Sequence, residues 1–213
     1  MGMPSGVPEV VIMRLPQYIR ILSEMLAGGV EMVSSQQLGE MLQVTPAQIR
    51  KDLSYFGRFG KQGRGYNVKG LLAELKEIMG LDRSWNVGLV GVGRLGRAIL
   101  SYPGFAPEGF HIIAAFDADP NLVGRVIGNL NVQSMNELDT VVKELDISIG
   151  IVAVPSRHAQ GVIDRLMDCG IKAILSYAPI APQGQAGVKI RNIDPVLSLQ
   201  TMTFYLSSGS AED

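Results

Sequence analysis

The feature that most constrains the fold of this chain is a glycine-rich turn between an apolar segment and a predicted helix. Residues 86–90, Asn-Val-Gly-Leu-Val, have the composition of a buried strand and continue directly into Gly91-Val92-Gly93-Arg94-Leu95-Gly96. Helix-forming residues follow at 97–100, and the next predicted strand ends at Asp117. Strand, glycine turn, helix and acidic strand end, in this order, predict a Rossmann-type unit that binds a dinucleotide.

The three glycines of this turn have separate expected roles. They permit a tight turn, close approach to a pyrophosphate, and close packing of helix on strand, while the helix N-terminus attracts the phosphates. Asp117 would accept hydrogen bonds from the adenosine ribose and repel a 2′-phosphate, so we expect NAD rather than NADP. Alternating elements follow: a capping box at Ser134 and Glu137, strands 147–154, 171–177 and 188–193, and a helix 156–170. Because ligands bind at the carboxyl ends of such strands, we also expect these residues at the nucleotide: Val154, Pro155, Tyr177, Ala178 and Pro179.

The N-terminal third of the chain predicts short helices. Pro16 is placed as in a first helical turn, and apolar residues recur from there to Gly28. A second helix begins at Ser34, and a third begins at Thr45-Pro46-Ala47-Gln48, an N-cap followed by proline and a capping-box glutamine. Two short helices joined by about three residues predict a helix-turn-helix, whose second helix meets base edges in the major groove of DNA.

The surface of the third helix carries the expected DNA contacts. Ala47, Gln48 and Lys51 could reach a thymine methyl, an adenine and a guanine, and Arg50 could contact phosphate. Residues 55–68 alternate around a tip at 61–64, which predicts a β-hairpin wing. The full set of expected DNA-binding residues is Thr45, Ala47, Gln48, Arg50, Lys51, Ser54, Lys61 and Arg64. The alternative for this region is a helical bundle with a solvated basic face.

Charge and composition limit the remaining possibilities. The net charge of −1 divides into +2 for residues 1–83 and −3 for residues 84–213, so the basic character is local to the predicted DNA-binding part. The single cysteine, Cys169, excludes an intrachain disulfide, and no Cys/His cluster predicts a metal site. No apolar run approaches the ~20 residues of a membrane span and no signal-peptide pattern opens the chain, so we expect no membrane partner and a cytoplasmic location.

A dinucleotide fold alone does not distinguish an enzyme from a sensor. The two histidines, His111 and His158, have no obvious acidic partner, and about 120 residues after Gly91 leave little for a substrate domain. We therefore expect no catalytic residue and interpret the nucleotide as a ligand. Two alternatives remain: a small NAD-dependent oxidoreductase with a helical appendage, and a CoA- or nucleotide-binding subunit of a larger enzyme.

Taken together, these segments resemble the Rex family of bacterial redox-sensing repressors over nearly the whole chain. The similar blocks, in family order, are RLPQY, VSSQQLGEML, AQIRKDLSYFGRFGKQGRGYNV, GVGRLGRAI, FDADP and GIKAILSYAP. The chain departs from the family at Ser176-Tyr177, where many members have Asn-Phe, and at Pro195, where an apolar residue is usual.

The resemblance implies an α/β architecture in three parts. A winged helix-turn-helix domain (1–83) precedes a Rossmann NAD(H)-binding domain (84–194) and a swapped C-terminal dimerisation helix with its tail (195–213). It implies a homodimer on a double-stranded, inverted-repeat operator that is released when NADH binds, with NAD⁺ as competitor. It further implies that Arg20, Tyr102 and Asp194 reorganise between the DNA-bound and NADH-bound forms.

Overall fold

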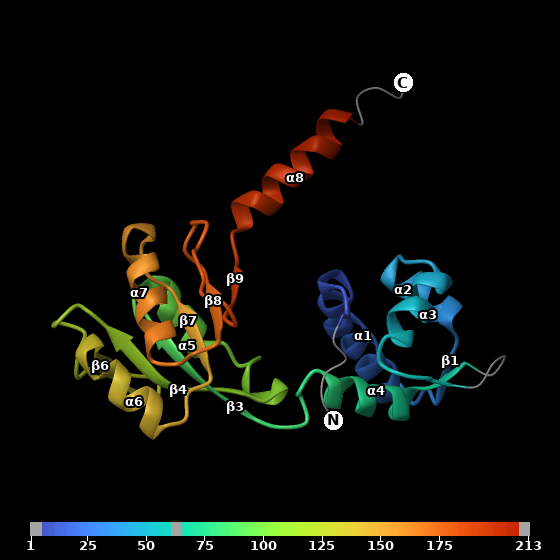
Figure 1. Cartoon of the computed structure of the whole chain (residues 1–213), viewed down its shortest axis with the longest axis horizontal. Coiled ribbons are helices and arrows are strands. Elements are labelled where there is room, and N and C mark those ends of the chain that lie inside the picture. Colours follow the sequence, from blue (N-terminus) through green and yellow to red (C-terminus); the bar gives the residue numbers. More distant parts are fainter. Residues whose placement is uncertain (1–5, 61–64, 209–213) are drawn as a thin grey trace. The chain divides into compact units, whose positions relative to one another are not determined.

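A computed structural model of the chain describes residues 6–60 and 65–208 (Figure 1). The chain divides into two compact units, Met1–Arg83 and Ser84–Asp213. The resemblance implies a separate dimerisation helix and tail at residues 195–213, and the contact-based division counts these residues with the second unit. Within the described ranges, no helix combines the length and the apolar run that a bilayer crossing requires.

In its described residues, the first unit has four helices around one apolar core. Its elements are α1 (Glu9–Ala27), β1 (Met32–Val33), α2 (Ser35–Leu42), α3 (Pro46–Ser54), β2 (Tyr66–Asn67) and α4 (Val68–Ile78). Leu22 of α1, Leu38 of α2, Ile49 of α3 and Leu75 of α4 are almost fully buried in the same core. Helix α4 was not predicted, although Leu71, Leu72 and Leu75 have helical spacing and Asn67 caps its first turn.

Two predictions about the helix bounds and strand pairing of this unit are wrong. Helix α1 begins at Glu9, so Pro16 lies inside it and not in its first turn. The proline lacks a backbone N–H, but the continuous helix is stabilised because it buries Val11 and Leu15 before the proline and Tyr18 after it. The predicted hairpin does not pair as expected, because β2 is antiparallel to β1 rather than to residues 55–60. Gly57 and Gly60 adopt positive φ angles of 145° and 76°, which interrupt an extended first arm.

The predicted helix-turn-helix is present. Ser34 caps α2 in a reciprocal capping box with Gln37, and the Thr45 hydroxyl accepts from the backbone N–H of Gln48 at the start of α3. The turn between the helices is tight, since a Cβ on Gly39 would lie 2.5 Å from the carbonyl oxygen of Val44. Packing against α2 therefore fixes the first turn of α3.

The second unit is a sheet with helices on both faces. Its strands are β3 (Trp85–Val90), β4 (Phe110–Asp117), β5 (Val126–Ile127), β6 (Leu130–Ser134), β7 (Ile149–Val152), β8 (Ala173–Ser176) and β9 (Lys189–Asn192). The helices are α5 (Arg94–Ser101), α6 (Leu138–Glu144), α7 (Ser156–Asp168) and α8 (Pro195–Ser208), with short 3₁₀ turns at Ala106–Glu108 and Met135–Glu137.

The strand order is β5-β6-β4-β3-β7-β8-β9, and all neighbours except the β5–β6 pair are parallel. Without β5, this is the doubly wound order 3-2-1-4-5-6. Ile99 of α5 packs with Val87 and Leu89 on one face, whereas Leu138 of α6 and Ile163 of α7 belong to a second cluster. In this topology the order reverses between β3 and β7, which places the ligand crevice at their carboxyl ends.

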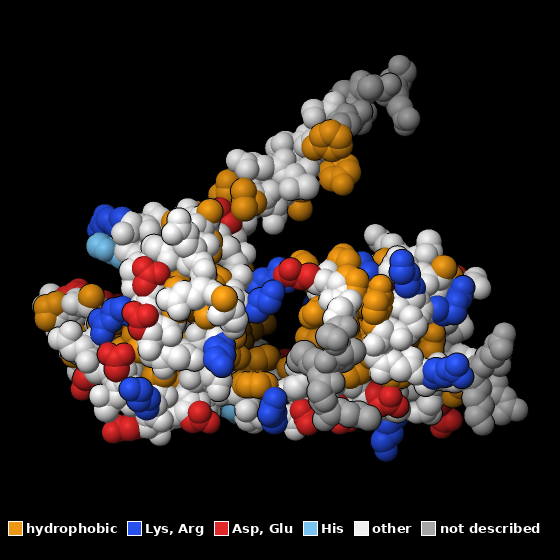
Figure 2. Space-filling model, viewed as in Figure 1, with side chains coloured by type: hydrophobic (Ala, Val, Ile, Leu, Met, Phe, Trp, Pro, Cys, Tyr) orange, Lys and Arg blue, Asp and Glu red, His pale blue; other side chains and the backbone are white. Residues whose placement is uncertain are grey.

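Helix α8 is unlike the other helices in its surroundings. Every side chain from Pro195 to Ser207 is exposed, including those of Phe204, Tyr205 and Leu206 at 66%, 69% and 76%. Figure 2 shows apolar side chains along its length. Soluble helices normally bury one apolar face, so a helix that is apolar on more than one side requires a partner surface.

Candidate nucleotide site and DNA-binding helix

The glycine turn between β3 and α5 has a distinct geometry at each glycine. Gly91 has a φ of 97°, and a Cβ there would lie 2.6 Å from the carbonyl oxygen of Ala153. A Cβ on Gly96 would lie 1.9 Å from the carbonyl oxygen of Gly91, so α5 can approach the strand only with glycine at this position. A Cβ on Gly93 would meet nothing within 4 Å. The three positions thus match the tight turn, the close helix packing and the open approach that a pyrophosphate needs.

Gly93 is also the N-cap residue of α5, without a side chain to satisfy the first amides of the helix. Arg94 and Leu95 lie in the first turn of α5 and are exposed, Leu95 at 45%. The unpaired amides and the helix dipole at such an N-terminus favour a phosphate. The turn therefore fits a dinucleotide.

Asp117 stands at the end of β4, beside the glycine turn. Its Oδ2 accepts a hydrogen bond of 2.7 Å from the Val92 amide, and its Oδ1 accepts one of 2.9 Å from the Asp119 amide. The carboxylate therefore links the turn to the loop after β4. Further lone pairs of its two oxygens remain for ligand hydroxyls, and Asp119 adds a second negative charge nearby in the chain.

The other predicted nucleotide residues follow β7 and β8 at the same edge of the sheet. A Cβ on Gly91 would lie 2.8 Å from Val154, which brings the β7 end against the glycine turn. Pro155 occupies the N-cap position of α7. The Tyr177 amide donates to the Val152 carbonyl oxygen, Ala178 is buried and Pro179 is exposed. Thus the structure brings the predicted nucleotide residues to one edge.

Helix α3 presents most of its predicted DNA-binding residues to solvent. Four of them are exposed: Ala47, Arg50, Lys51 and Ser54. Arg50 donates a hydrogen bond of 2.9 Å to the Ser35 hydroxyl. The Gln48 side chain is half-buried and donates to Asp52 instead of returning to Thr45, so the side-chain half of the expected capping box is wrong. Lys61 and Arg64, the expected wing cations, lie outside the described residues.

Sequence reasoning missed a buried polar cluster behind α3. Asp52 is 0% exposed, and its carboxylate accepts from both Nε and Nη2 of Arg14 at 2.6 and 2.7 Å and from the Tyr18 hydroxyl at 2.5 Å. Burial by itself raises the pKa of Asp52, but hydrogen bonds from Arg14, Tyr18 and Gln48 outweigh it and lower that pKa. Burial also raises the pKa of Tyr18. The sequence contains a signal for this cluster. Asp52 is the one acid in the basic stretch 45–70, and Arg14 and Tyr18 lie one helical turn apart in the preceding helix.

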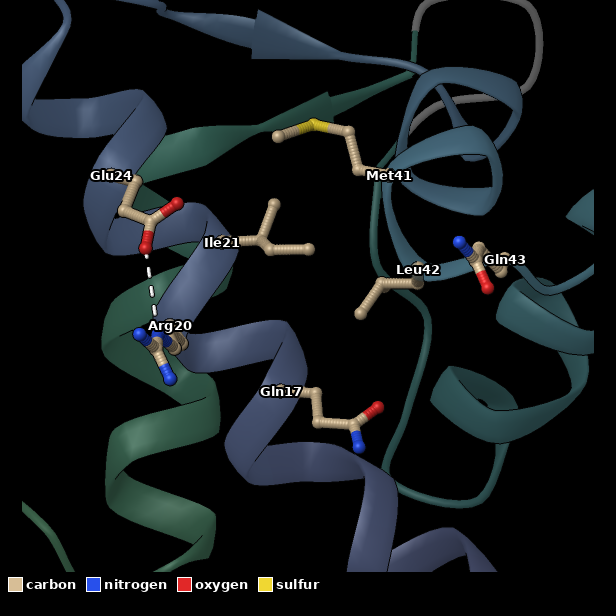
Figure 3. Close-up of a pocket in the computed structure, with 7 residues that line it drawn as sticks. All are labelled: Gln17, Arg20, Ile21, Glu24, Met41, Leu42 and Gln43. Atoms are coloured by element: carbon tan, nitrogen blue, oxygen red, sulfur yellow. Dashed lines mark ion pairs between the residues drawn. The ribbon is translucent and has the colours of Figure 1, made fainter. Parts of the chain in front are cut away.

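The predicted switch residues belong to both units. Arg20 is exposed and pairs with Glu24 at 3.5 Å, at a hollow between α1 and α2 that Ile21, Met41 and Leu42 also line (Figure 3). In the second unit, Tyr102 is 60% exposed and stacks edge-on against Phe105. Asp194 accepts from the Val196 amide at 3.0 Å and so caps α8. Arg20 and Tyr102 are exposed and Asp194 is partly exposed, and the role of the three residues in a switch stays a prediction.

Two further titratable side chains, His158 and Cys169, make local contacts within the second unit. His158 accepts from the neighbouring Arg157 at 2.9 Å on the exposed first turn of α7. Cys169 is buried and donates to Asp139 at 2.7 Å, and burial, followed by Asp139, raises the pKa of its thiol to about 12. Within residues 6–60 and 65–208, no group of three or more His, Cys, Asp or Glu could hold a metal ion.

Comparison with known proteins matches the N-terminal and C-terminal parts of the chain to two different families. Residues 6–54 match a family described as "Putative DNA-binding protein N-terminus", and residues 82–180 match one described as "CoA binding domain". The Redox-sensing transcriptional repressor Rex of Roseiflexus sp. (strain RS-1) is 54% identical over 200 residues, covering 94% of this chain and 91% of the relative. The Rex repressor of Chloroflexus aurantiacus (strain J-10-fl) is 52% identical, with 94% of each covered.

The chain belongs to the Rex family. As a member of a family of transcriptional repressors it is a regulator and not an oxidoreductase, which removes the enzyme alternative. The crystal structure of RSP with β-NAD⁺ and operator DNA aligns with a TM-score of 0.91 at 39% identity, covering 96% of this chain and 94% of that one. RSP with β-NADH aligns with a TM-score of 0.86 at 37% identity, covering 97% of each. The Rex architecture of a DNA-binding unit and a Rossmann unit is thereby confirmed.

Proposed function

We propose that this protein represses transcription by binding operator DNA through α3 and leaves the DNA when NADH occupies the glycine turn of its Rossmann unit. The observation that carries the proposal is the presence, in one chain, of a capped helix-turn-helix and a turn whose Gly93 is open to a pyrophosphate. The relatives named redox-sensing repressors, and the RSP complexes with operator DNA, β-NAD⁺ and β-NADH, support it.

At the DNA, the exposed side of α3 would lie in the major groove. Lys51 would contact guanine and Ala47 a thymine methyl, while Arg50 and Ser54 would lie toward phosphates, with Thr45 at the helix N-terminus. We propose that Lys61 and Arg64 add backbone or minor-groove contacts. Phosphate contacts make binding fall with salt, whereas base contacts determine the preferred sequence.

At the nucleotide, the first turn of α5 would hold the pyrophosphate, and Asp117 would accept from the adenosine ribose. Val154, Pro155, Tyr177, Ala178 and Pro179 would line the remainder of the site. NAD⁺ would compete with NADH for the same residues, and the negative charge at Asp117 would disfavour NADP(H). Asp117 alone does not separate NAD(H) from CoA, because the ribose of CoA also carries a hydroxyl; the Rex relatives and the RSP complexes with β-NAD⁺ and β-NADH favour NAD(H).

The working form would be a homodimer assembled through α8. The exposed apolar side chains from Val196 to Leu206 need a partner surface, and a two-fold dimer would pair two α3 helices with an inverted-repeat operator. Adjacent major-groove contacts require ~34–36 Å between the two recognition helices, so a small change in dimer geometry is enough to weaken binding. We propose that Arg20, Tyr102 and Asp194 change partners in that step, and that the repressor acts on the chromosome in the cytoplasm.

The decisive experiment is a gel-shift titration with NADH, NAD⁺ and NADPH. The probe is an inverted-repeat duplex selected by the protein from random DNA. We expect NADH to release the duplex at far lower concentration than NADPH; a ~100-fold loss of DNA affinity corresponds to ~2.7 kcal/mol of differential binding. A protein that selects no duplex, or one that NADH leaves bound, would refute the proposal.

The dimer is tested by sedimentation. Met202→Glu in α8 should yield monomers with weaker DNA binding, whereas Lys143→Glu, on the exposed side of α6, should leave a dimer. An unchanged dimer in Met202→Glu would remove α8 from the interface.

A further inference from the structure

The buried cluster around Asp52 connects α1 to the recognition helix. Three of the hydrogen bonds that its carboxylate accepts come from α1, two from Arg14 and one from Tyr18. The fourth comes from Nε2 of Gln48, at 2.6 Å from Oδ1. A buried carboxylate is tolerated only when its oxygens are satisfied in this way.

The fourth donor differs from the others in its position. Gln48 lies one turn before Asp52, in the first turn of α3, where helix-turn-helix proteins contact base edges. Its side chain is half-buried, unlike the exposed Ala47 and Lys51 beside it. Its amide nitrogen therefore faces the buried cluster, while the side chain as a whole stays partly accessible to solvent.

The chemistry of the two groups fixes the orientation of the amide. An ionised carboxylate only accepts hydrogen bonds, so the nitrogen of Gln48 and not its oxygen must face Asp52. One N–H is used in this contact, and among residues 6–60 and 65–208 the second N–H and Oε1 have no other partner. Adenine in the major groove needs that pair, an N–H for its N7 and an acceptor for its N6 amino group.

We propose that Asp52, held in place by the two hydrogen bonds from Arg14, is a positioning residue that fixes the Gln48 amide for adenine and thereby sets the preference of the protein at one base pair of each operator half-site. The inference rests on the proposed DNA-binding function. The lowered pKa of Asp52 is consistent with it, since the carboxylate stays ionised, and so acceptor-only, around neutral pH.

The test measures base preference rather than affinity alone. The probe is the duplex that the unmodified protein selects from random DNA, remade with every single base-pair substitution. A good bidentate contact corresponds to a preference of about 5- to 150-fold at its base pair. Gln48→Ala should abolish the adenine preference at one position of each half-site and leave the other positions unchanged.

Asp52→Asn should reduce the preference at that same base pair, because an asparagine can present an N–H to Gln48 and allow its amide to turn over. Added to Gln48→Ala, it should cause no further loss there. Tyr18→Phe is the matched control: it removes a hydrogen bond to Oδ2 but leaves Oδ1 to Gln48, so it should lower thermal stability and keep the preference.

Arg14→Lys provides a second route if Asp52→Asn does not fold. It removes the two-point contact that fixes the orientation of the Asp52 carboxylate, so the Gln48 amide should be less well positioned and the preference at that base pair should fall. An equal loss at all base pairs, or an unchanged preference in whichever of the two variants folds, overturns the inference. Failure of the unmodified protein to select any duplex would instead refute the proposed function, so the two failures are distinguishable.

Discussion

Alanine at Gly93 and at Gly96 should separate nucleotide binding from the stability of the fold. At Gly96 the new Cβ would lie 1.9 Å from the oxygen and 2.9 Å from the carbon of the Gly91 carbonyl, so α5 must move away from β3. Overpacking of this kind costs ~1–3 kcal/mol, which for a unit of this size lowers Tm by roughly 4–12 °C. At Gly93, where a Cβ meets nothing within 4 Å and φ is −71°, alanine should change Tm by less than about 2 °C.

The affinity for NADH should follow a different order. A methyl group on Gly93 occupies the open approach to the first turn of α5, so we expect Gly93→Ala to weaken NADH at least tenfold, or about 1.4 kcal/mol. Calorimetric titration gives the affinity, and thermal melts with and without NADH provide a control, since ligand at 100 times Kd adds about 2.7 kcal/mol to the unmodified protein. Unchanged NADH affinity in Gly93→Ala, or a Tm loss equal to that of Gly96→Ala, would refute this assignment of the glycines.

Three further predictions concern charge. NADH should bind far better than NADPH, and Asp117→Asn should narrow that gap because it removes the repelling charge; equal titration curves for the two cofactors with the unmodified protein would contradict this. Lys51→Ala should weaken operator binding by ~1–3 kcal/mol and relax the preference for guanine, whereas Lys143→Ala should have no effect in the same gel shift. Arg14→Met should cost roughly 3–5 kcal/mol at pH 7, because Asp52 keeps its burial but loses its main partner. The lowered pKa of Asp52 contributes stability above about pH 4, and this contribution disappears as the pH falls through that pKa. The difference in Tm between the unmodified protein and Arg14→Met should therefore shrink in acid. A constant difference would count against the ion pair.

The glycine turn and the acid at the end of the next strand could be predicted from sequence because their signals are local. The turn at Gly91 and the acid at Asp117 lie within one strand-helix-strand unit. Gly91 is required by its positive φ and Gly96 by its contact with the Gly91 carbonyl, whereas Gly93 leaves the approach to the helix open. The caps at Ser34 and Thr45 were predictable for the same reason, since a capping hydroxyl and its amide partner are three residues apart.

The features that sequence reasoning missed depend on contacts between distant segments. Arg14 meets Asp52 across 38 residues, and nothing in either segment alone specifies that pairing. Likewise β2 pairs with a two-residue strand that precedes the helix-turn-helix, so alternation within 55–68 was a poor guide to its partner. The local preference of proline for a first helical turn predicts a helix that begins at Pro16. Burial of α1 residues on both sides of the proline overrides this preference.

Cys169 has a consequence for how an oxidising environment reaches this protein. Peroxides and alkylating agents react with thiolates, and a buried thiol with a pKa of about 12, already donating to Asp139, is almost entirely protonated at neutral pH. Because this is the single cysteine of the chain, direct thiol oxidation has no accessible entry point. A cell could therefore suffer a burst of oxidant without forming a disulfide through Cys169 of this repressor.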